Sequence, residues 1–163
     1  MRLRSLNSMV EEIKRGDGDT AVTPGVLRVL VGDKKINHLY RGNKLLLDAD
    51  RLPEDINQIL KLNENKTMPR IRSIHKAYLE LRKESPELGM SEEMIRILVG
   101  MGNLPCIRVG NRAYIALESF EPPYNESLIS IDYRESEDRM LERRAQEQFD
   151  SNMARQANRK GGR

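Results

Sequence analysis

The chain has 163 residues, of which 33 % are charged and only 4 % are aromatic, and it contains no tryptophan. No apolar run approaches the roughly 18 residues that a membrane-spanning helix needs, so this composition argues against a membrane protein. The single cysteine, Cys106, cannot form an internal disulfide, and residues 1–14 lack the apolar core of a signal peptide, so we expect a cytoplasmic protein.

The formal net charge is +3, and it is unevenly distributed along the chain. Residues 1–52 contain ten Lys and Arg against seven Asp and Glu, whereas residues 68–122 contain eight against seven. The last nine residues contain four cations and no acid, which is typical of a disordered basic arm. A mild excess of positive charge favours nucleic acid as a partner without identifying one.

The first predicted element is a helix that begins after Ser5, whose hydroxyl can accept an early backbone N–H. Apolar residues then recur at helical spacing on one face: Leu6, Met9, Val10 and Ile13. The glycines of Gly16-Asp17-Gly18-Asp19 end this helix.

A second helix is predicted to begin at Thr23, because threonine is a good N-cap and Pro24 is tolerated in a first turn. Its buried side consists of Val26, Leu27, Leu30 and Val31, while Arg28 points away from them. Residues 36–41 and 44–47 then predict two short strands around the turn Gly42-Asn43, where glycine in the first central position suits a type II′ turn.

The middle of the chain predicts a helical segment over residues 48–62 and a polar linker over 63–67. A helix follows from Ser73 to about Lys83, then a loop over 84–89 and another helix capped by Ser91. A second hairpin has its tip at residues 109–112. Gly102 occupies a position where helices commonly close in a left-handed conformation, and the matching residue upstream is Lys34, so we expect that turn to be strained or differently shaped.

The C-terminal part predicts an extended segment over residues 124–133, followed by a strongly charged segment over 134–157. Leu141, Ala145, Phe149 and Met153 recur there every four residues. This narrow stripe fits either a helix that docks on the body or on a partner, or a solvated and only partly formed helix.

An internal repeat relates the two halves of this pattern. Shifting residues 2–52 by 68 positions places them on residues 70–120 without a gap, and ten of the 51 pairs are identical. The identical pairs are Arg2/Arg70, Arg4/Arg72, Ser5/Ser73, Glu12/Glu80, Arg28/Arg96, Leu30/Leu98, Val31/Val99, Gly32/Gly100, Gly42/Gly110 and Asn43/Asn111. We therefore predict a mainly α fold with small β-hairpin wings (α+β), divided into copy 1 (residues 1–52), a helical and polar linker (53–67), copy 2 (68–122) and a charged extension (123–163), partly helical and then disordered.

Each copy combines a helix bearing one outward arginine with a hairpin whose tip carries cations. A helix of this kind can enter the major groove of DNA while the hairpin contacts the backbone beside it. The candidate residues are Thr23, Gly25, Arg28, Tyr40, Arg41, Asn43 and Lys44 in copy 1, and Ser91, Arg96, Arg108, Asn111 and Arg112 in copy 2. Solvated surface arginines are the alternative explanation, and their recurrence at one repeat position favours a functional role.

Catalysis and metal binding have little support in the sequence. His38, His75 and Cys106 occupy no recognisable metal-ligand spacing, and the glycines form no phosphate-binding loop. We therefore expect no catalytic residue, no metal and no cofactor.

The residues Arg96 to Val99, Gly102 to Pro105, Arg108 to Arg112 and Tyr114-Ile115 resemble the excisionase-type, MerR-like winged helix-turn-helix family. Copy 1 is a weaker match that keeps five of the positions, namely Arg28, Leu30, Val31, Gly42 and Asn43, but has Lys34 and Asn37 in place of the glycine and the proline. The resemblance implies binding to double-stranded DNA, either by a mobile-element factor that bends DNA and directs a tyrosine recombinase toward excision, or by a small transcription regulator.

Copy 2 departs from this pattern in its predicted recognition helix, which begins with Glu92 and Glu93. Both acids favour the helix dipole but would face DNA phosphates. Copy 2 is therefore open to two interpretations, a weak DNA-binding unit or a unit that binds protein. The alternative function is an interaction module, for example a mobile-element inhibitor of a host nucleic-acid-handling complex, with the charged extension as a further contact for a protein partner.

Overall fold

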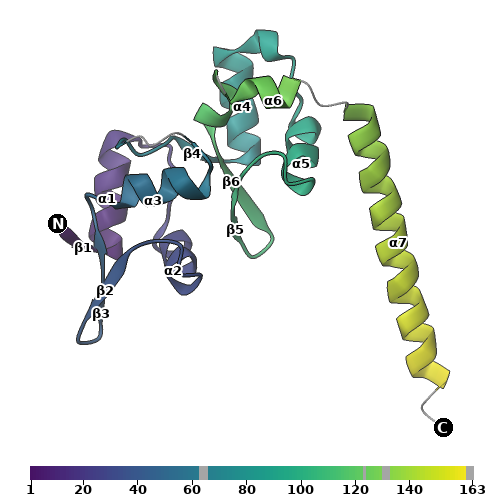
Figure 1. Cartoon of the computed structure of the whole chain (residues 1–163), viewed down its shortest axis with the longest axis horizontal. Coiled ribbons are helices and arrows are strands. Elements are labelled where there is room, and N and C mark those ends of the chain that lie inside the picture. The colour runs from purple at the N-terminus through teal and green to yellow at the C-terminus, as the bar shows by residue number, and fades with distance from the viewer. Residues whose placement is uncertain (63–65, 123, 130–132, 161–163) are drawn as a thin grey trace. The chain divides into compact units, whose positions relative to one another are not determined.

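The computed structural model describes residues 1–62, 66–122, 124–129 and 133–160 of the chain. It contains helices and two three-stranded antiparallel sheets (Figure 1), which confirms the predicted α+β class. The chain forms two compact units, Met1–Ile129 and Ser130–Arg163, which we describe separately. No described helix has the length and apolar character to cross a membrane.

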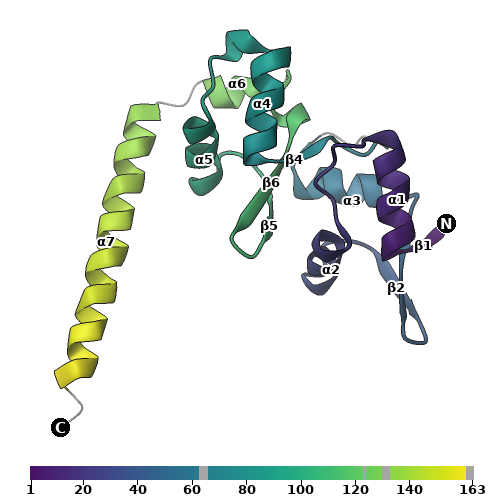
Figure 2. The ribbon, with the colours of Figure 1, turned by 180° about the vertical axis from the view of Figure 1, so that it is seen from behind.

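Copy 1 contains a helical pair followed by a hairpin, with a short strand in front (Figures 1 and 2). Its elements are β1 (Leu3–Ser5), α1 (Leu6–Gly16), α2 (Pro24–Gly32), β2 (His38–Arg41), β3 (Lys44–Asp48) and, continuing into the linker, α3 (Leu52–Ile59). The sheet order is β1-β3-β2. Helix α1 begins where predicted, since the Ser5 hydroxyl accepts the backbone N–H of Ser8 at 3.3 Å.

Copy 2 repeats this order of elements. They are β4 (Ile71–Ser73), α4 (Ile74–Glu84), the 3₁₀ turn η1 (Pro86–Leu88), α5 (Glu92–Gly100), β5 (Ile107–Val109), β6 (Arg112–Ala116) and the 3₁₀ turn η2 (Leu117–Phe120). The sheet order β4-β6-β5 matches that of copy 1, and the Ser73 hydroxyl caps α4 as Ser5 caps α1. The internal repeat read from the sequence is thus a repeat of structure.

Both hairpin turns begin with a glycine of positive φ. Gly42 and Gly110 have φ of 60° and 58°, in the left-handed region. The positive-φ non-glycine residues of the described chain are Lys34 and Lys61, so Asn43 and Asn111 have negative φ. One left-handed residue followed by a residue with negative φ excludes a type I′ turn and agrees with the predicted type II′ turn.

Ion pairs that recur at the same spacing in both copies explain several of the identical repeat positions. Arg4 pairs with Glu12 across eight residues, and Arg72 pairs with Glu80 across the same interval. Arg2 contacts Asp50 at 3.5 Å, and Arg70 contacts Glu118, 68 residues further on, at 3.2 Å. Each pair ties the first strand of its copy, or the residue directly before that strand, to a neighbouring helix or to the turn after the hairpin.

The two copies contact each other through β4 and the loop between α1 and α2. The backbone N–H of Ala21 donates to the carbonyl of Ile71 at 2.8 Å. The Arg72 side chain, only 4 % exposed, binds Asp17 through two nitrogens at 2.6 and 2.9 Å and Glu80 at 2.5 Å. Burial disfavours its charge, but the hydrogen bonds to Asp17 and Glu80 outweigh that effect and raise its pKa.

The face of the copy 2 sheet opposite α4 shares a core with copy 1. Ile71, Ile107 and Ala116 are at most 2 % exposed and belong to the same buried cluster as the apolar side chains of α1, α2 and α3. Val109 and Tyr114 pack against that cluster. This packing makes residues 1–129 one compact unit rather than two independent domains.

The linker is more structured than a polar connection. Helix α3 ends at Ile59, and Leu60 is buried. The buried Asn57 donates from its side-chain amide to the carbonyls of Pro53 and Thr67, at 2.8 and 3.0 Å. It therefore holds the two ends of the linker together, while residues 63–65 of the predicted linker lie outside the described residues.

The prediction of an extended segment over residues 124–133 was wrong where the structure describes it. Residues Asn125–Ile129 form the short helix α6, in which Leu128 is 3 % exposed. The backbone N–H of Asn125 donates to the carbonyl of Glu121, so the turn after η2 continues into a helix. Residues 130–132 lie outside the described residues.

The charged C-terminal segment forms one helix, α7 (Tyr133–Lys160). It continues into the basic stretch that the sequence predicts to be a disordered arm, of which residues 161–163 lie outside the described residues. Within α7, Leu141, Phe149 and Met153 are 55 %, 60 % and 53 % exposed. The stripe of apolar residues thus lies on a helix, on which these three side chains are exposed.

Candidate nucleic-acid interface

Helix α2 presents a small, uncharged first turn and one exposed arginine. Thr23 caps it, its hydroxyl accepting the backbone N–H of Val26 at 3.2 Å, and Pro24 occupies the first turn. Val26, Leu27, Leu30 and Val31 are buried, so the helix has a fixed inner side. Gly25 and Arg28 are exposed on the other side, and the first turn contains no acidic residue. The surface that remains carries the cation Arg28 and a first turn without acidic side chains.

The β2–β3 hairpin places the other predicted residues of copy 1 in solvent. Tyr40 is 67 % exposed, and its ring contacts the edge of the His38 ring, with a distance of 5.7 Å between the ring centroids. Arg41, Asn43 and Lys44 form the exposed tip around Gly42. Residues 33–37 join α2 to this hairpin. Helix and tip are therefore short-range neighbours in the chain and carry charge of the same sign.

The cations of this surface are available to a partner. Across the described residues, Arg28, Arg41 and Lys44 have no ion pair with any acid. Two further cations at the end of α2, Lys34 and Lys35, are also exposed, although Lys35 contacts Asp33 at 3.1 Å. The sequence interpretation omitted these two lysines, whose position directly before the hairpin was a usable signal.

Copy 2 engages its equivalent arginine within the chain. Arg96 lies one turn after Glu92 on α5 and donates to its carboxylate at 2.5 Å. The other oxygen of Glu92 lies 2.8 Å from Nδ1 of His75 on α4. Hydrogen bonds from His75 and from Arg96 lower the pKa of Glu92 below its ordinary value, so the carboxylate is ionised at neutral pH. Arg96 is thus held by an anion, whereas Arg28, at the same repeat position, pairs with no acid among the described residues.

The copy 2 hairpin is also less free than that of copy 1. Arg108 donates to the backbone carbonyl of Val99 at the end of α5, at 3.4 Å. Asn111 and Arg112 remain exposed at the tip, and Ser91 caps α5 through its hydroxyl. The structure therefore places all twelve predicted residues on α2, on α5, at the N-caps of these helices or on the hairpins, but in copy 2 it occupies Arg96 and Arg108 with contacts inside the chain.

The groups considered for metal binding remain separate. No cluster of three or more His, Cys, Asp or Glu side chains occurs within the described part of the chain. His38 donates from Nδ1 to the Ile36 carbonyl at 3.1 Å, His75 contacts Glu92, and Cys106 is a free, half-buried thiol.

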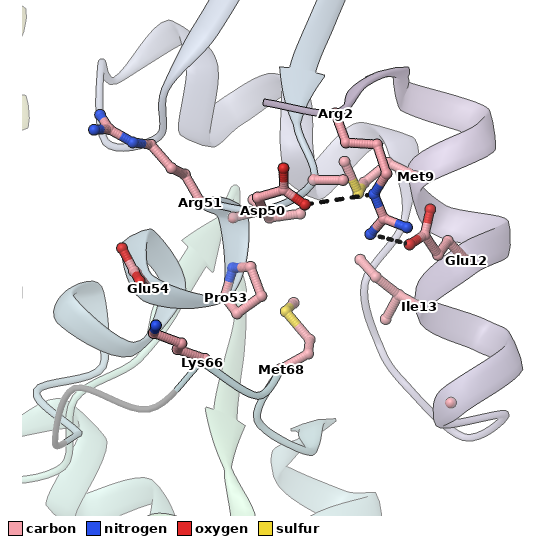
Figure 3. A pocket seen from close by; sticks show the side chains of 13 residues that line it. Arg2, Met9, Glu12, Ile13, Asp50, Arg51, Pro53, Glu54, Lys66 and Met68 are labelled. Atoms are coloured by element: carbon pink, nitrogen blue, oxygen red, sulfur yellow. Dashed lines mark ion pairs between the residues drawn. The ribbon is translucent and has the colours of Figure 1, made fainter.

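A pocket of about 680 Å³ lies against α1 and the start of α3 (Figure 3). Figure 3 shows Arg2 at its wall, where the side chain bridges Glu12 and Asp50. The lining contains three cations and three acids, with Met9, Ile13 and Met68 as apolar contacts. Balanced and partly paired charges provide no concentrated attraction for an anionic ligand, so the exposed surface of α2 and its hairpin is the stronger candidate site.

Comparison with protein families, with curated proteins and with solved structures found no match to this chain.

Proposed function

We propose that this chain is a non-enzymatic protein that binds double-stranded DNA through copy 1, on a tandem winged helix-turn-helix scaffold of the excisionase type. The observation that carries the proposal is the set Arg28, Arg41 and Lys44 on α2 and the adjoining hairpin, none of which pairs with an acid in the described part of the chain. In this arrangement α2 enters the major groove, where Arg28 contacts base edges, and the hairpin tip contacts phosphates. The role is that of a recombination factor or a transcription regulator of a mobile element.

Copy 2 serves mainly as the rigid partner of copy 1 in this proposal. Glu92 neutralises Arg96, and Glu93 adds an exposed negative charge to the same turn, so this helix is poorly suited to approach phosphates. The same acids favour a second candidate function, in which copy 2 contacts a basic surface on a protein such as a tyrosine recombinase. Purification from nuclease-treated cells distinguishes the two, because a stoichiometric protein that remains bound without any retention on DNA favours the second.

The proposal is tested by measuring duplex binding at several salt concentrations. We expect the Arg41→Ala/Lys44→Ala variant to bind every duplex sequence more weakly and to reduce the slope of log K against log salt by about 2, because two phosphate contacts are lost. The repeat-related tip of copy 2 provides the control, and Arg108→Ala/Arg112→Ala should change the slope by less. A slope that is unaffected by the copy 1 variant, or more affected by the copy 2 variant, would contradict the assignment.

A further inference from the structure

The internal repeat leaves one sheet face of copy 1 without the covering that its counterpart has. In copy 2, Ile71 and Ile107 on that face are 0 % and 2 % exposed because they belong to the core shared with copy 1. Their counterparts, 68 residues earlier, are Leu3, which is half-buried, and Leu39, which is 47 % exposed. Leu39 lies directly opposite Leu46 across β2 and β3, so both side chains are on the same face.

This face is also hollowed. A cavity of about 570 Å³ is lined by Leu3, Leu39, Asp48 and neighbouring residues, with Met1 at its edge. Met1 is 84 % exposed. Leucine side chains line this hollow together with the charged Asp48, Asp50 and Arg51. Exposed leucines on a concave sheet face form a surface that another protein element can cover. We name Leu3, Leu39 and Leu46 the open sheet face.

The loop of copy 1 that covers the copy 2 sheet has an equivalent loop in copy 2, and this second loop covers no sheet in the described part of the chain. In copy 1 the covering loop contains Thr20, which is 9 % exposed, and the fully buried Val22, and Ala21 between them donates to Ile71. The same loop in copy 2 contains Leu88 and Met90, both only half-buried. A pocket of about 350 Å³ lies there, lined among others by Tyr78, Leu81, Leu88 and Met90. We name this the open loop pocket.

We propose that two copies of this chain associate head to tail, with the open sheet face of one seated in the open loop pocket of the next. Inside the chain, the copy 1 loop covers the copy 2 sheet. In the proposed contact, the copy 2 loop, 68 residues later, covers the copy 1 sheet of the next chain in the same way. Each chain offers one of each surface, so the association does not close on itself and can add further chains.

The charges near the two surfaces predict a weak, reversible contact. Inside the chain, Arg72 binds Asp17, and Lys76 contacts Asp19 at 3.7 Å. At the proposed contact Arg4 takes the place of Arg72, and the acceptor positions are Ser85 and Glu87. By the same offset Ser8 takes the place of Lys76, so Arg4 meets the uncharged Ser85 and Glu87 meets the uncharged Ser8, and neither ion pair is reproduced. The association should therefore depend on protein concentration.

Sedimentation velocity of the full chain, freed of nucleic acid, tests the proposal with two complementary variants. Leu39→Glu removes the open sheet face and Met90→Glu removes the open loop pocket, and each should weaken self-association by roughly tenfold or more because a charge replaces a buried apolar side chain. The decisive sample is their equimolar mixture, which should form a dimer and nothing larger, because each variant supplies the surface that the other lacks.

Circular dichroism melting of both variants establishes that each is folded, and Leu141→Glu on α7 is the control, which should associate as the wild-type chain does. Three results would overturn the proposal: a wild-type chain that stays monomeric up to its solubility limit, folded variants whose mixture stays monomeric, or loss of association in Leu141→Glu, which would assign the contact to the stripe on α7.

Discussion

Lys34 shows at the scale of one residue how copy 1 has departed from the repeat. Its φ of 56° is the left-handed conformation that Gly102 adopts in copy 2 with φ of 77°. Both helices end with the same bonds, since Lys35 donates to Leu30 and Asn103 donates to Leu98, each at 2.9 Å. The expectation of a strained or differently shaped turn is thus resolved: the turn keeps its shape, and a side chain occupies a conformation suited to glycine.

Lys34→Gly should therefore stabilise the protein by about 0.5 to 1 kcal/mol. The substitution relieves the strain of a left-handed lysine, but the greater freedom of glycine in the unfolded chain offsets part of that gain. Urea denaturation measures this change. Gly102→Ala is the matched control and should destabilise by about 1 kcal/mol. Because a Cβ at Gly102 would meet no atom within 4 Å apart from those of its chain neighbours, that loss comes from local backbone strain and not from a clash with the surrounding fold. Equal midpoints for Lys34→Gly and the wild type would argue against strain in this turn.

Glu92 decides, again at the scale of one residue, whether the copy 2 arginine is available. Its carboxylate contacts both His75 and Arg96. We expect Glu92→Gln to increase affinity for duplex DNA, because the substitution releases Arg96 and removes a negative charge near phosphates. Glu93→Gln removes the same charge without releasing Arg96, and it should give the smaller gain in fluorescence anisotropy titrations. If the two variants gain equally, the contact between Glu92 and Arg96 has no part in the effect.

Among the helices and strands, Arg4 and Arg72 occupy the same repeat position but make different contacts. Arg4 and Arg72 both pair with a glutamate eight residues later, but Arg4 is 42 % exposed and Arg72 is 4 % exposed. Only Arg72 also binds Asp17, in the loop of the other copy. The pair that is a surface feature in copy 1 has become the buried connection between α1, β4 and α4 in copy 2.

Arg72→Ala should accordingly destabilise the protein by about 3 kcal/mol, because it leaves Asp17 and Glu80 without their cation at a partly buried site. Arg4→Ala, at the matching repeat position, should cost less than about 1 kcal/mol, since an exposed pair is screened by solvent. Chemical denaturation of the two variants side by side gives the comparison. Similar losses would mean that burial of Arg72 has little influence on the energy of the contact.

The elements of this fold were predictable where the sequence carries a local pattern. Helices α1, α2 and α4 follow from Ser and Thr caps and from apolar spacing, and the hairpins follow from their Gly-Asn turns. The three-residue strands β1 and β4 were missed, because so short a segment has no periodicity of its own and exists only through pairing with β3 and β6. Helix α6 was missed for a related reason, since burial of Leu128 and not local propensity accounts for it.

The sequence predicted which residues belong to the candidate site, but it did not predict which of its cations pair with an acid inside the chain. Recurrence of Arg28 and Arg96 at one repeat position identified both arginines. Their difference depends on Glu92 and on His75, which is 17 residues earlier in the chain and reaches Glu92 only through the packing of α4 and α5. A contact of this kind arises from tertiary structure, and no spacing rule in the sequence indicates it.

At the scale of the whole molecule, residues 1–129 act as one body in which copy 2 is fixed to copy 1 by a shared core and a buried arginine. In the proposed function, copy 1 supplies the positively charged surface that binds DNA. Copy 2 supplies the equivalent surface with its positive charge partly neutralised. The asymmetry between the two copies, and not their similarity, is the central claim.

The most direct test of that claim compares Arg28→Ala with Arg96→Ala for sequence-specific binding. A preferred duplex is first selected from a random pool with the wild-type chain, and both variants are then titrated with it and with single-base changes of it. We predict that Arg28→Ala loses roughly 1 to 3 kcal/mol of discrimination at one base pair, and that Arg96→Ala binds with nearly wild-type affinity and preference. Equal binding by the two variants, or a greater loss in Arg96→Ala, would contradict the account.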